Sequence, residues 1–408
     1  MEKQLQPTLR FPEFEGNWKY YSFKDIFSFT TGKNIKQKEA SPSFDTPCVR
    51  YGELYYMYKE VITKVINYTN LDVSELKFSE GDEILLPSAG EDPMDIGSAS
   101  ALILKDVAIG RTINILKPKN KNVYSSIFAS YYINQNLKIK ISTLAKGVSI
   151  SNVYNSDLQT LYLKLPSLPE QQKIADYLST IDTKLNLLEE KKSELTRYKK
   201  AMMQKLFSQE IRFRDDNGNE FPLWEEKRLG DEIVVKVGAT PSTNRKEFWN
   251  GNIPWINSGE LKDGKIYTPS KYISELGLKN TSTYLLPKGT VVLAMTGATL
   301  GKLGLLLLES TANQSVAGFI PNNNLINEYL FYYLMNFQSK IFEKAGGAAQ
   351  IGINKFNIES LKIHFPSLPE QQKIADFLSA IDASIEKVEE QIKETQSFKK
   401  AMLQQMFV

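Results

Sequence analysis

Apolar residues recur with a seven-residue period in two long segments of the chain, residues 166–209 and 366–408. Neither segment contains a glycine, and neither contains a proline beyond its first turn. Apolar positions spaced alternately four and three residues apart are typical of a helix that packs on a partner helix along a narrow stripe. In the first segment the stripe comprises Ile174, Leu178, Ile181, Leu185, Leu188, Leu195, Met202 and Leu206, interrupted by Lys192 and Lys199. In the second segment it comprises Ile374, Leu378, Ile381, Ile385, Val388, Ile392, Met402 and Met406.

The two segments are near copies of one another, 200 residues apart. Residues 166–182 read PSLPEQQKIADYLSTID and residues 366–382 read PSLPEQQKIADFLSAID, which agree at 15 of 17 positions. A repeat of this length indicates a repeated architecture. We expect two helices, each about 60 Å long, that pair as an antiparallel coiled coil. The alternative is that each helix packs only on its own domain, but the long and narrow stripe favours pairing.

Both helices are predicted to begin at a capping box and to follow a strand. Ser167 and Glu170 form the S-x-x-E pattern of a helix N-terminus, and Ser367 and Glu370 repeat it. Apolar residues alternate just before each helix, at Leu161, Leu163 and Leu165 and at Leu361, Ile363 and Phe365. This period of two predicts a strand that leads into each helix.

Two globular regions, residues 1–165 and 223–365, precede the helices and resemble each other weakly. The matched positions include Gly81 with Gly289, each opening an expected strand, and Tyr131-Tyr132 with Tyr332-Tyr333, on an expected helix. Residues 210–222 are rich in turn residues and are expected to form a linker. The predicted fold class is α+β, with two similar α/β domains separated by two long antiparallel coiled-coil helices (166–209 and 366–408) and related by a pseudo-twofold axis.

Composition places the chain among soluble globular proteins, with 42% hydrophobic and 24% charged residues. A single cysteine permits no internal disulfide and fits a reducing compartment. The N-terminus has no apolar signal segment, and the longest apolar run, Leu303–Leu308, is too short to span a bilayer. We therefore expect a cytoplasmic protein with no membrane association. The net charge of +3 does not by itself indicate a nucleic-acid partner.

This organisation resembles the specificity subunit of type I restriction–modification systems. The resemblance is carried by FPEFEGNW at 11–18, GATPSTN and IPWINSGEL within 238–261, the two PSLPEQQKIADxLSxID runs and the KKAMxQxxF helix ends. It covers essentially the whole chain. It implies that each globular domain is a target-recognition domain that reads one half of a bipartite double-stranded DNA sequence, with the two helices as the spacer.

The resemblance also implies the partners and cofactors. Two methyltransferase (modification) subunits would bind S-adenosylmethionine and methylate adenine N6, and restriction/motor subunits would use ATP and Mg. This chain would hold no cofactor and no metal, and it would be a non-catalytic component. Aromatic residues that the helices offer for outside contacts are Tyr177, Tyr198, Phe207, Phe377, Phe398 and Phe407.

The residues themselves argue against catalysis by this chain. One histidine, His364, and one cysteine, Cys48, cannot assemble a zinc site from the usual ligands. His364 is expected to face solvent, and Cys48 is expected to have a packing role. Residues 297–303, GATLGKL, have the wrong spacing for a P-loop and no hydroxyl after Lys302. No N-P-P-Y-like tetrapeptide of an amino-methyltransferase occurs.

Recognition of DNA requires Lys and Arg for phosphates, and Arg, Lys, Asn or Gln for base edges. Candidates are polar residues in the divergent loops between matching strands, where distinct specificities are expected. In the first domain they are Lys33, Lys36, Lys38, Arg50, Tyr51, Lys146, Ser149 and Asn152. In the second they are Asn244, Arg245, Lys246, Asn257, Lys302, Gln314, Gln350, Asn354 and Lys355. Each alone is also an ordinary solvated loop residue.

Two other functions stay open at this point. The first is a coiled-coil scaffold that binds only protein partners, and a salt-dependent affinity for DNA would distinguish it from a specificity subunit. The second is an enzyme that acts alone on DNA, such as a methyltransferase. Methyl transfer measured without partner subunits would test it.

Overall fold

The computed structural model describes residues 6–120, 122–343, 345 and 352–408. The chain divides into two compact units, one of Met1–Glu189 with Glu390–Val408 and the other of Glu190–Glu389. Both boundaries fall within long helices rather than within the linker expected at residues 210–222. Each unit therefore combines a globular region with one segment from each long helix.

The long helices have the predicted extent. Helix α7 spans Leu168–Phe207 and helix α13 spans Leu368–Met406, with 40 and 39 residues. The predicted stripe residues are all buried or half-buried. In the part of the chain that the structure describes, no helix combines the length and apolarity needed to cross a membrane.

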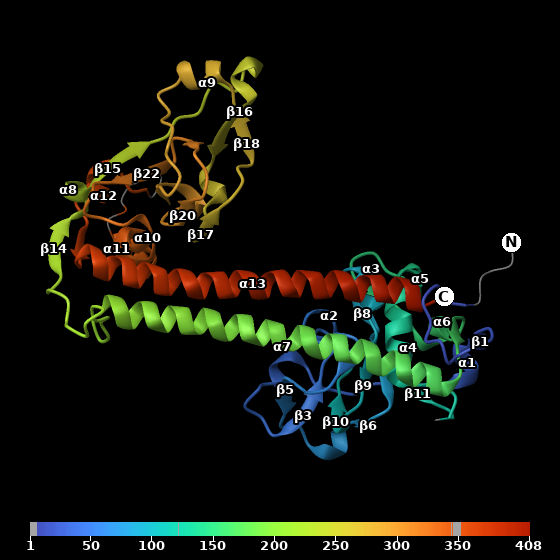
Figure 1. The fold of residues 1–408 in the computed structure, drawn as a ribbon. Helices are drawn as coiled ribbons and strands as arrows, with labels where there is room; N and C mark the ends of the chain where they lie inside the picture. The colour runs from blue at the N-terminus through green and yellow to red at the C-terminus, as the bar shows by residue number, and fades with distance from the viewer. Residues whose placement is uncertain (1–5, 121, 344, 346–351) are drawn as a thin grey trace. The chain divides into compact units, whose positions relative to one another are not determined.

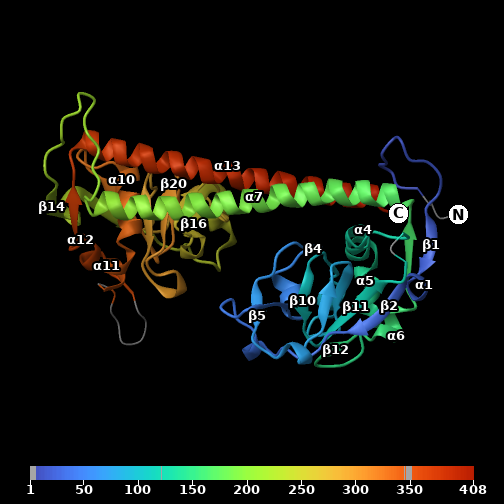
Figure 2. The same cartoon turned by 90° about the horizontal axis from the view of Figure 1, so that it is seen from below.

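A five-stranded sheet forms the centre of the first unit. Its order is β2 (Phe27–Thr31), β11 (Ile113–Pro118), β7 (Glu83–Pro87), β9 (Ser100–Leu102) and β4 (Val61–Ile62). A four-stranded sheet has the order β5 (Asn67–Thr69), β3 (Thr46–Val49), β10 (Lys105–Ile109) and β6 (Phe78–Glu80). Two-stranded ladders join β1 (Lys19–Ser22) to β13 (Tyr162–Leu165), and β8 (Ala89–Gly90) to β12 (Ser151–Asn152). Figure 2 labels several strands of this unit, among them β2, β10 and β11.

The helices of the first unit pack on the five-stranded sheet. Helix α4 (Ser126–Tyr132) contacts β7 and β9, and it continues through a π-helical turn into α5 (Lys138–Leu144). Short helices are α1 (Phe23–Ile26), α2 (Glu53–Tyr56), α3 (Pro93–Ile96) and α6 (Asn155–Leu158). Apolar residues of the sheet, α4 and the long-helix segments form one core, because each element presents an apolar face to the others.

The second unit repeats the five-stranded sheet of the first and has a smaller second sheet. Its five-stranded sheet has the order β15 (Ile233–Val237), β22 (Val316–Pro321), β19 (Val291–Ala294), β20 (Leu303–Leu306) and β17 (Gly264–Ile266). The second sheet has the order β18 (Lys271–Ile273), β16 (Trp249–Ile256) and β21 (Thr311–Ala312), and β14 (Glu225–Arg228) pairs with β23 (Lys362–Phe365). The helices are α8 (Leu229–Glu232), α9 (Glu275–Lys279), α10 (Asn327–Asn336), α11 (Gln338–Glu343) and α12 (Lys355–Glu359). The strands predicted after Gly81 and Gly289 and before each long helix are confirmed, as are the helices that carry the paired tyrosines.

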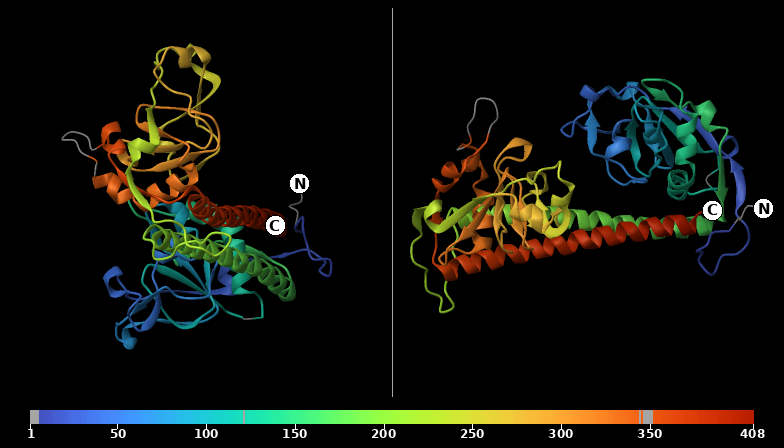
Figure 3. Two further views of the ribbon diagram at one scale, coloured as in Figure 1. Left: turned by 60° about the vertical axis from the view of Figure 1, so that its left-hand side comes forward. Right: turned by 90° about the horizontal axis from the view of Figure 1, so that it is seen from above.

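The two long helices pair in antiparallel orientation. In the second unit Lys192 on α7 lies 2.7 Å from Glu389 on α13, and Lys199, further along α7, lies 2.6 Å from Asp382, further back on α13. The helices lie side by side in Figure 1 and in both panels of Figure 3. The predicted pairing is therefore confirmed.

The aromatic residue at the end of each long helix is buried in a globular core. The Phe407 ring lies 5.3 Å from Phe128 and 5.9 Å from Tyr132 in the first unit. The Phe207 ring lies 5.8 Å from Tyr329 and 5.4 Å from Tyr333 in the second. The expectation that Phe207 and Phe407 are free for outside contacts is thus wrong.

The other helix aromatics divide into two groups. The Tyr177 and Phe377 rings contact Phe11 and Phe213 at 5.9 and 5.6 Å, so both are partly covered within the chain. Tyr198 and Phe398 remain 48% and 47% exposed. Only the latter two, among these six, keep a large exposed surface.

A buried glutamate at the start of each long helix binds an arginine from the preceding segment. Arg10 donates hydrogen bonds of 2.8 and 2.7 Å to Glu170, and Arg212 donates bonds of 3.0 and 2.8 Å to Glu370. The hydroxyl of Ser367 is buried and has no hydrogen-bond partner in the part of the chain that the structure describes. The capping box predicted for the second helix is therefore wrong, and its glutamate anchors the segment around Arg212.

The adjacent glutamine explains a second part of the repeat. Gln171 accepts a hydrogen bond from the backbone N–H of Ser125 at 2.9 Å and donates to the carbonyls of Val123 and Pro166. Gln371 makes the equivalent bonds with Ile326, Asn324 and Pro366. Because both amides are buried, these bonds satisfy backbone groups that would otherwise lack partners.

Candidate nucleic-acid interface

Several loops of the first unit leave the sheets at one end. Thr31, the last residue of β2, pairs with Asn114, and Pro87, the last residue of β7, pairs with Ile113. The N–H of Gly110 bonds to the carbonyl of Val49, which brings the end of β3 to the same place. We call this region the loop end. In the first unit it comprises residues 32–38, 50–51, 88–92, 110–112 and 146–152.

The second unit has an equivalent loop end. Val237, the last residue of β15, pairs with Ala317, and Ala294, the last residue of β19, pairs with Val316. The N–H of Asn313 bonds to the carbonyl of Ile256, as Gly110 bonds to Val49 in the first unit. This loop end comprises residues 238–246, 257–260, 295–302, 313–315 and 352–355.

The first loop after β2 holds an unusual backbone conformation. Asn34 and Ile35 both have positive φ, 51° and 56°, which is rare for a β-branched residue. The Asn34 amide donates a 2.7 Å bond to the carbonyl of Glu75, and the buried Ile35 packs into a small core. These contacts fix the loop and leave Lys33, Lys36 and Lys38 exposed beside it.

Arg50 is engaged within the chain. Its Nε atom donates a 2.8 Å bond to Glu53, whose side chain is buried and also accepts from Asn67. The neighbouring Tyr51 is 41% exposed. Of these two candidates, Tyr51 has the freer surface, and the guanidinium of Arg50 also neutralises a buried carboxylate.

The candidates at 146–152 lie on a hairpin. The backbones of Lys146 and Asn152 bond to each other, and Ser149 is exposed at the tip between them. Lys146 lies 2.7 Å from Asp157, and this hydrogen bond lowers the pKa of the Asp157 carboxyl. Val148, also at the tip, is fully exposed, an apolar feature that the search for polar residues did not include.

In the second unit, Asn244, Arg245 and Lys246 are all exposed in the loop after β15. The Arg245 guanidinium lies 5.4 Å from the Phe248 ring, which supports the arginine from one side. Gln314, also exposed, accepts a 2.5 Å bond from the hydroxyl of Thr240. This loop and the turn at 313–315 therefore present one contiguous polar surface.

Other candidates of the second unit have partners within the chain. Asn257 accepts a 2.9 Å bond from the N–H of Gly259, and Asn354 accepts from the N–H of Asn357 at the start of α12. Lys302 lies 2.5 Å from Asp263 and Lys355 lies 3.6 Å from Glu359. Gln350 lies outside the described residues. The assignment of all these residues to DNA contacts stays a prediction.

Arg111 is a further candidate that was not predicted from the sequence. It is exposed at the first loop end, and its N–H bonds to the carbonyl of Asn34. Because Gly110 and Asn313 make the same strand-end bond, Arg111 occupies the position that Gln314 holds in the second unit. A match between the strands β10 and β21 would have revealed it, but those strands share too few residues to be aligned from sequence.

Cys48 and His364 have structural surroundings. The Cys48 thiol is buried, and burial raises its pKa to about 12, which leaves it almost entirely protonated at neutral pH. The backbone N–H of His364 bonds to the hydroxyl of Tyr333 at 3.1 Å, and its ring nitrogen Nδ1 lies 3.3 Å from that same oxygen. His364 is half-buried, whereas the sequence predicted that it faces solvent.

Comparison with known proteins identifies the class. A family model described as "Type I restriction modification DNA specificity domain" matches residues 15–197 and again residues 223–395. The chain therefore belongs to the family of type I restriction–modification DNA specificity proteins, and it carries two copies of the specificity domain.

Individual relatives support this assignment. The MjaVIII specificity subunit of Methanocaldococcus jannaschii is 27% identical over 400 residues, which cover 93% of this chain and 88% of the relative. The MjaIX specificity subunit from the same organism is 32% identical over 191 residues, 45% of this chain and 44% of that relative. The chain thus spans less than half of the MjaIX subunit. An S subunit from M. genitalium has the same fold, with a TM-score of 0.67 at 18% identity over 99% of both chains.

Proposed function

We propose that this chain is the DNA-reading subunit of a type I restriction–modification complex, in which each unit reads one half of a bipartite double-stranded target. The observation that carries the proposal is the pair of loop ends. Both are built on the same strand ends, yet they present different exposed side chains, such as Arg111 in one unit and Gln314 in the other. A shared frame with different polar groups is what two separate sequence readings require.

The chemistry would belong to partner subunits. Methyltransferase subunits that bind S-adenosylmethionine would methylate adenine N6, and restriction/motor subunits would use ATP and Mg. Because the helix starts are near copies, we expect two equivalent docking positions and two methyltransferase subunits per chain. Tyr198 and Phe398, exposed at matching positions of the two helices, are candidates for these contacts. Native mass spectrometry that finds one methyltransferase per chain would contradict this stoichiometry.

The test of the proposed function is a map of methylated adenines in host DNA, with and without the gene for this chain. We expect methylation at one bipartite sequence that disappears with the gene. The purified complex should bind a duplex of that sequence with an affinity that falls steeply with salt. An unchanged methylation map and no salt-dependent DNA binding would favour a scaffold that binds only proteins.

A further inference from the structure

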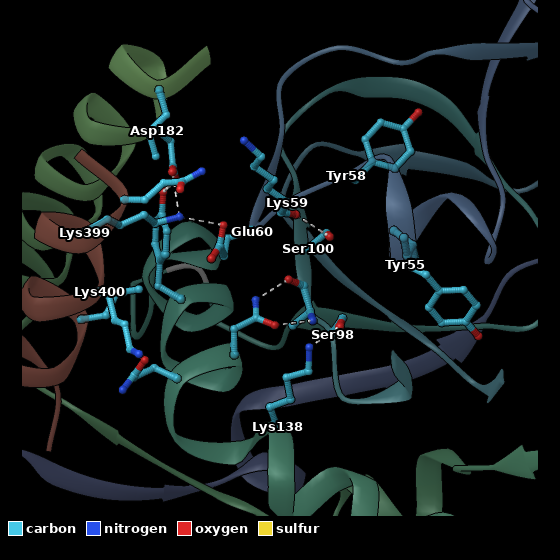
Figure 4. Close-up of a pocket in the computed structure, with 18 residues that line it drawn as sticks. Tyr55, Tyr58, Lys59, Glu60, Ser98, Ser100, Lys138, Asp182, Lys399 and Lys400 are labelled. Carbon is cyan, nitrogen blue, oxygen red and sulfur yellow. Dashed lines mark hydrogen bonds and ion pairs between the residues drawn. The ribbon is translucent and has the colours of Figure 1, made fainter. Parts of the chain in front are cut away.

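Four charged or polar side chains meet where the long helices pack on the first globular region. Lys399 of α13 lies 2.7 Å from Asp182 of α7 and 3.0 Å from Glu60, and Tyr131 of α4 donates a 2.5 Å bond to Asp182. Figure 4 shows Lys399 between the two carboxylates. The lysine and aspartate side chains are 12% and 15% exposed, beside a cavity of about 470 Å³.

The same cluster occurs in the second unit. Lys199 of α7 lies 2.6 Å from Asp382 of α13, and Tyr332 of α10 donates a 2.6 Å bond to the same carboxylate. These side chains are 13% and 17% exposed. In both units the lysine and the aspartate come from different long helices, and the tyrosine comes from the globular region.

Both lysines occupy positions of the heptad stripe that an apolar residue would otherwise fill. Burial lowers the pKa of Lys399, but the carboxylates of Glu60 and Asp182 outweigh burial, and the net pKa is raised. The lysine therefore stays charged. A nearly buried ion pair adds little stability relative to apolar residues of similar volume, but loss of one partner is strongly destabilising. Such a pair penalises every arrangement in which the partners are separated.

The alternative registers of the two helices separate these partners. The pairs 182–399, 192–389 and 199–382 share one antiparallel register. If one helix slides by one heptad in one direction, Asp182 would face Met406 and Asp382 would face Leu206. In the other direction, Lys399 would face Ala175 and Lys199 would face Ala375. Each slide therefore leaves two nearly buried charges of like sign against apolar residues.

We propose that the two Lys–Asp–Tyr clusters fix the axial register of α7 against α13, with Lys199, Lys399, Asp182 and Asp382 acting as positioning residues. The apolar stripe alone repeats every seven residues and would accept a slide of one heptad, whereas the clusters would not. The consequence for DNA, a fixed spacing between the two half-sites, rests on the proposed function.

The test replaces both ion pairs with apolar residues in the full-length chain: Lys199→Met, Lys399→Met, Asp182→Leu and Asp382→Leu together. Spin labels on cysteines at the exposed positions Glu190 and Gln404 would report the distance between the helices along their axes. Cys48 should not be labelled, because it is buried. We expect one distance in the parent protein. In the apolar variant we expect a second population displaced by about 10 Å, one heptad of rise, without loss of helix content.

A matched control is the pair Lys192 and Glu389, which joins the same helices in the same register but is 43% and 49% exposed. Replacement of both by Ala should leave a single distance, because exposed pairs contribute little. A single unshifted distance in the apolar variant would overturn the proposal. So would a second distance in the alanine control equal to that in the apolar variant.

A second set of variants covers the case in which the apolar variant does not fold. Lys199→Asp alone places two carboxylates together and should lower the melting temperature, whereas Lys199→Asp with Asp382→Lys should recover most of the loss and keep the single distance. No recovery would overturn the proposal. These measurements need no DNA, so a failure here is distinguishable from a failure of the proposed function, which the methylation map tests.

Discussion

The long helices and the loop ends differ in how closely the two units agree. At the helix starts, Arg10 with Glu170 and Arg212 with Glu370 form the same buried pair twice. At the loop ends, equivalent strand ends carry different side chains. Buried polar contacts constrain the residue type at both partners, whereas exposed loop residues carry no packing constraint. The comparison thus separates the residues that build each unit from those available to a ligand.

Unequal lengths of the two long helices should have the largest effect on methylation, because they disrupt the helix pairing that both units share. Asp182 and Lys199 on α7 are separated by 17 positions, as are Asp382 and Lys399 on α13, so both ion pairs form together. Four residues inserted after Leu188 alone would lengthen only one helix, by about 6 Å. One nearly buried pair must then break. We expect methylation to be lost at every site in cells that carry this variant, as measured by methylation sequencing.

Matched insertions would sharpen this result. Four residues after both Leu188 and Val388 restore equal lengths and nearly preserve rotation, since one turn has about 3.6 residues. The added length of about 6 Å corresponds to one to two base pairs at about 3.4 Å each. We expect methylation to return with a longer unread spacer and the same half-sites. An unchanged spacer would show that helix length does not set the distance between the two half-sites. The control is a pair of matched two-residue insertions, which rotate the apolar stripe by about half a turn and should abolish methylation.

The two buried arginine–glutamate pairs should differ in how much stability is lost when the arginine is removed, because only Glu370 accepts an additional hydrogen bond from a tryptophan. Arg10→Ala leaves the buried Glu170 without its cation and should lower the free energy of unfolding by about 3 kcal/mol or more. Arg212→Ala should have a smaller effect, because the indole N–H of Trp224 still donates to Glu370 at 3.0 Å, whereas the N–H of Trp18 has no partner among the described residues. Chemical denaturation would measure both.

The control for the two arginine variants is Arg214→Ala, at a residue 64% exposed, which should change the free energy of unfolding by less than about 0.5 kcal/mol. Equal losses for Arg10→Ala and Arg212→Ala would show that the Trp224 bond adds nothing. A loss below about 1 kcal/mol for both would show that the buried glutamates do not need their cations.

The helices and strands were predictable because their apolar periods are set by local geometry and occur twice. The role of Arg212 was not predictable. Arg212 lies 12 positions before Trp224, whereas Arg10 lies only eight before Trp18, so no common spacing showed that the two arginines are equivalent. The burial of Phe407 also escaped the sequence, since a heptad stripe does not specify which globular core covers its end.

The candidate site was predictable only as a set of loops. Exposure of the loops follows from their position between matched strands. The internal partners of two candidates were readable in principle: Arg50 and Asn257 each stand three residues before a glutamate, Glu53 and Glu260, in the repeated G-E-L sequence. Both glutamates accept bonds from the residue three positions before them. Contacts between distant loops, such as Arg111 with Asn34, depend on the tertiary fold.

Loop charges of the second unit should affect only one half of the target. We expect Arg245→Ala with Lys246→Ala to weaken binding by about 1–3 kcal/mol if they contact bases, with relaxed methylation at second-half positions only. If they contact phosphates, affinity should fall on every sequence and the salt slope should decrease by about one per residue. Lys279→Ala, at an exposed lysine of α9 outside this loop end, is the matched control. Unchanged affinity and slope in the double variant would show that this loop does not face DNA.

The smallest effect is expected at the hairpin of the first unit, where Lys146 holds Asp157. The hydrogen bond from Lys146 lowers the pKa of Asp157, so the folded state binds that proton less tightly than the unfolded state. The resulting stability is present above the ordinary carboxyl pKa of about 4 and is lost as the pH falls through the lower folded value. Because Lys146 is 67% exposed, Lys146→Ala should reduce the free energy of unfolding by less than about 1 kcal/mol at pH 7. The difference from the parent protein should shrink below pH 4, whereas a difference that persists at pH 2 would show that Lys146 acts through packing and not through its charge.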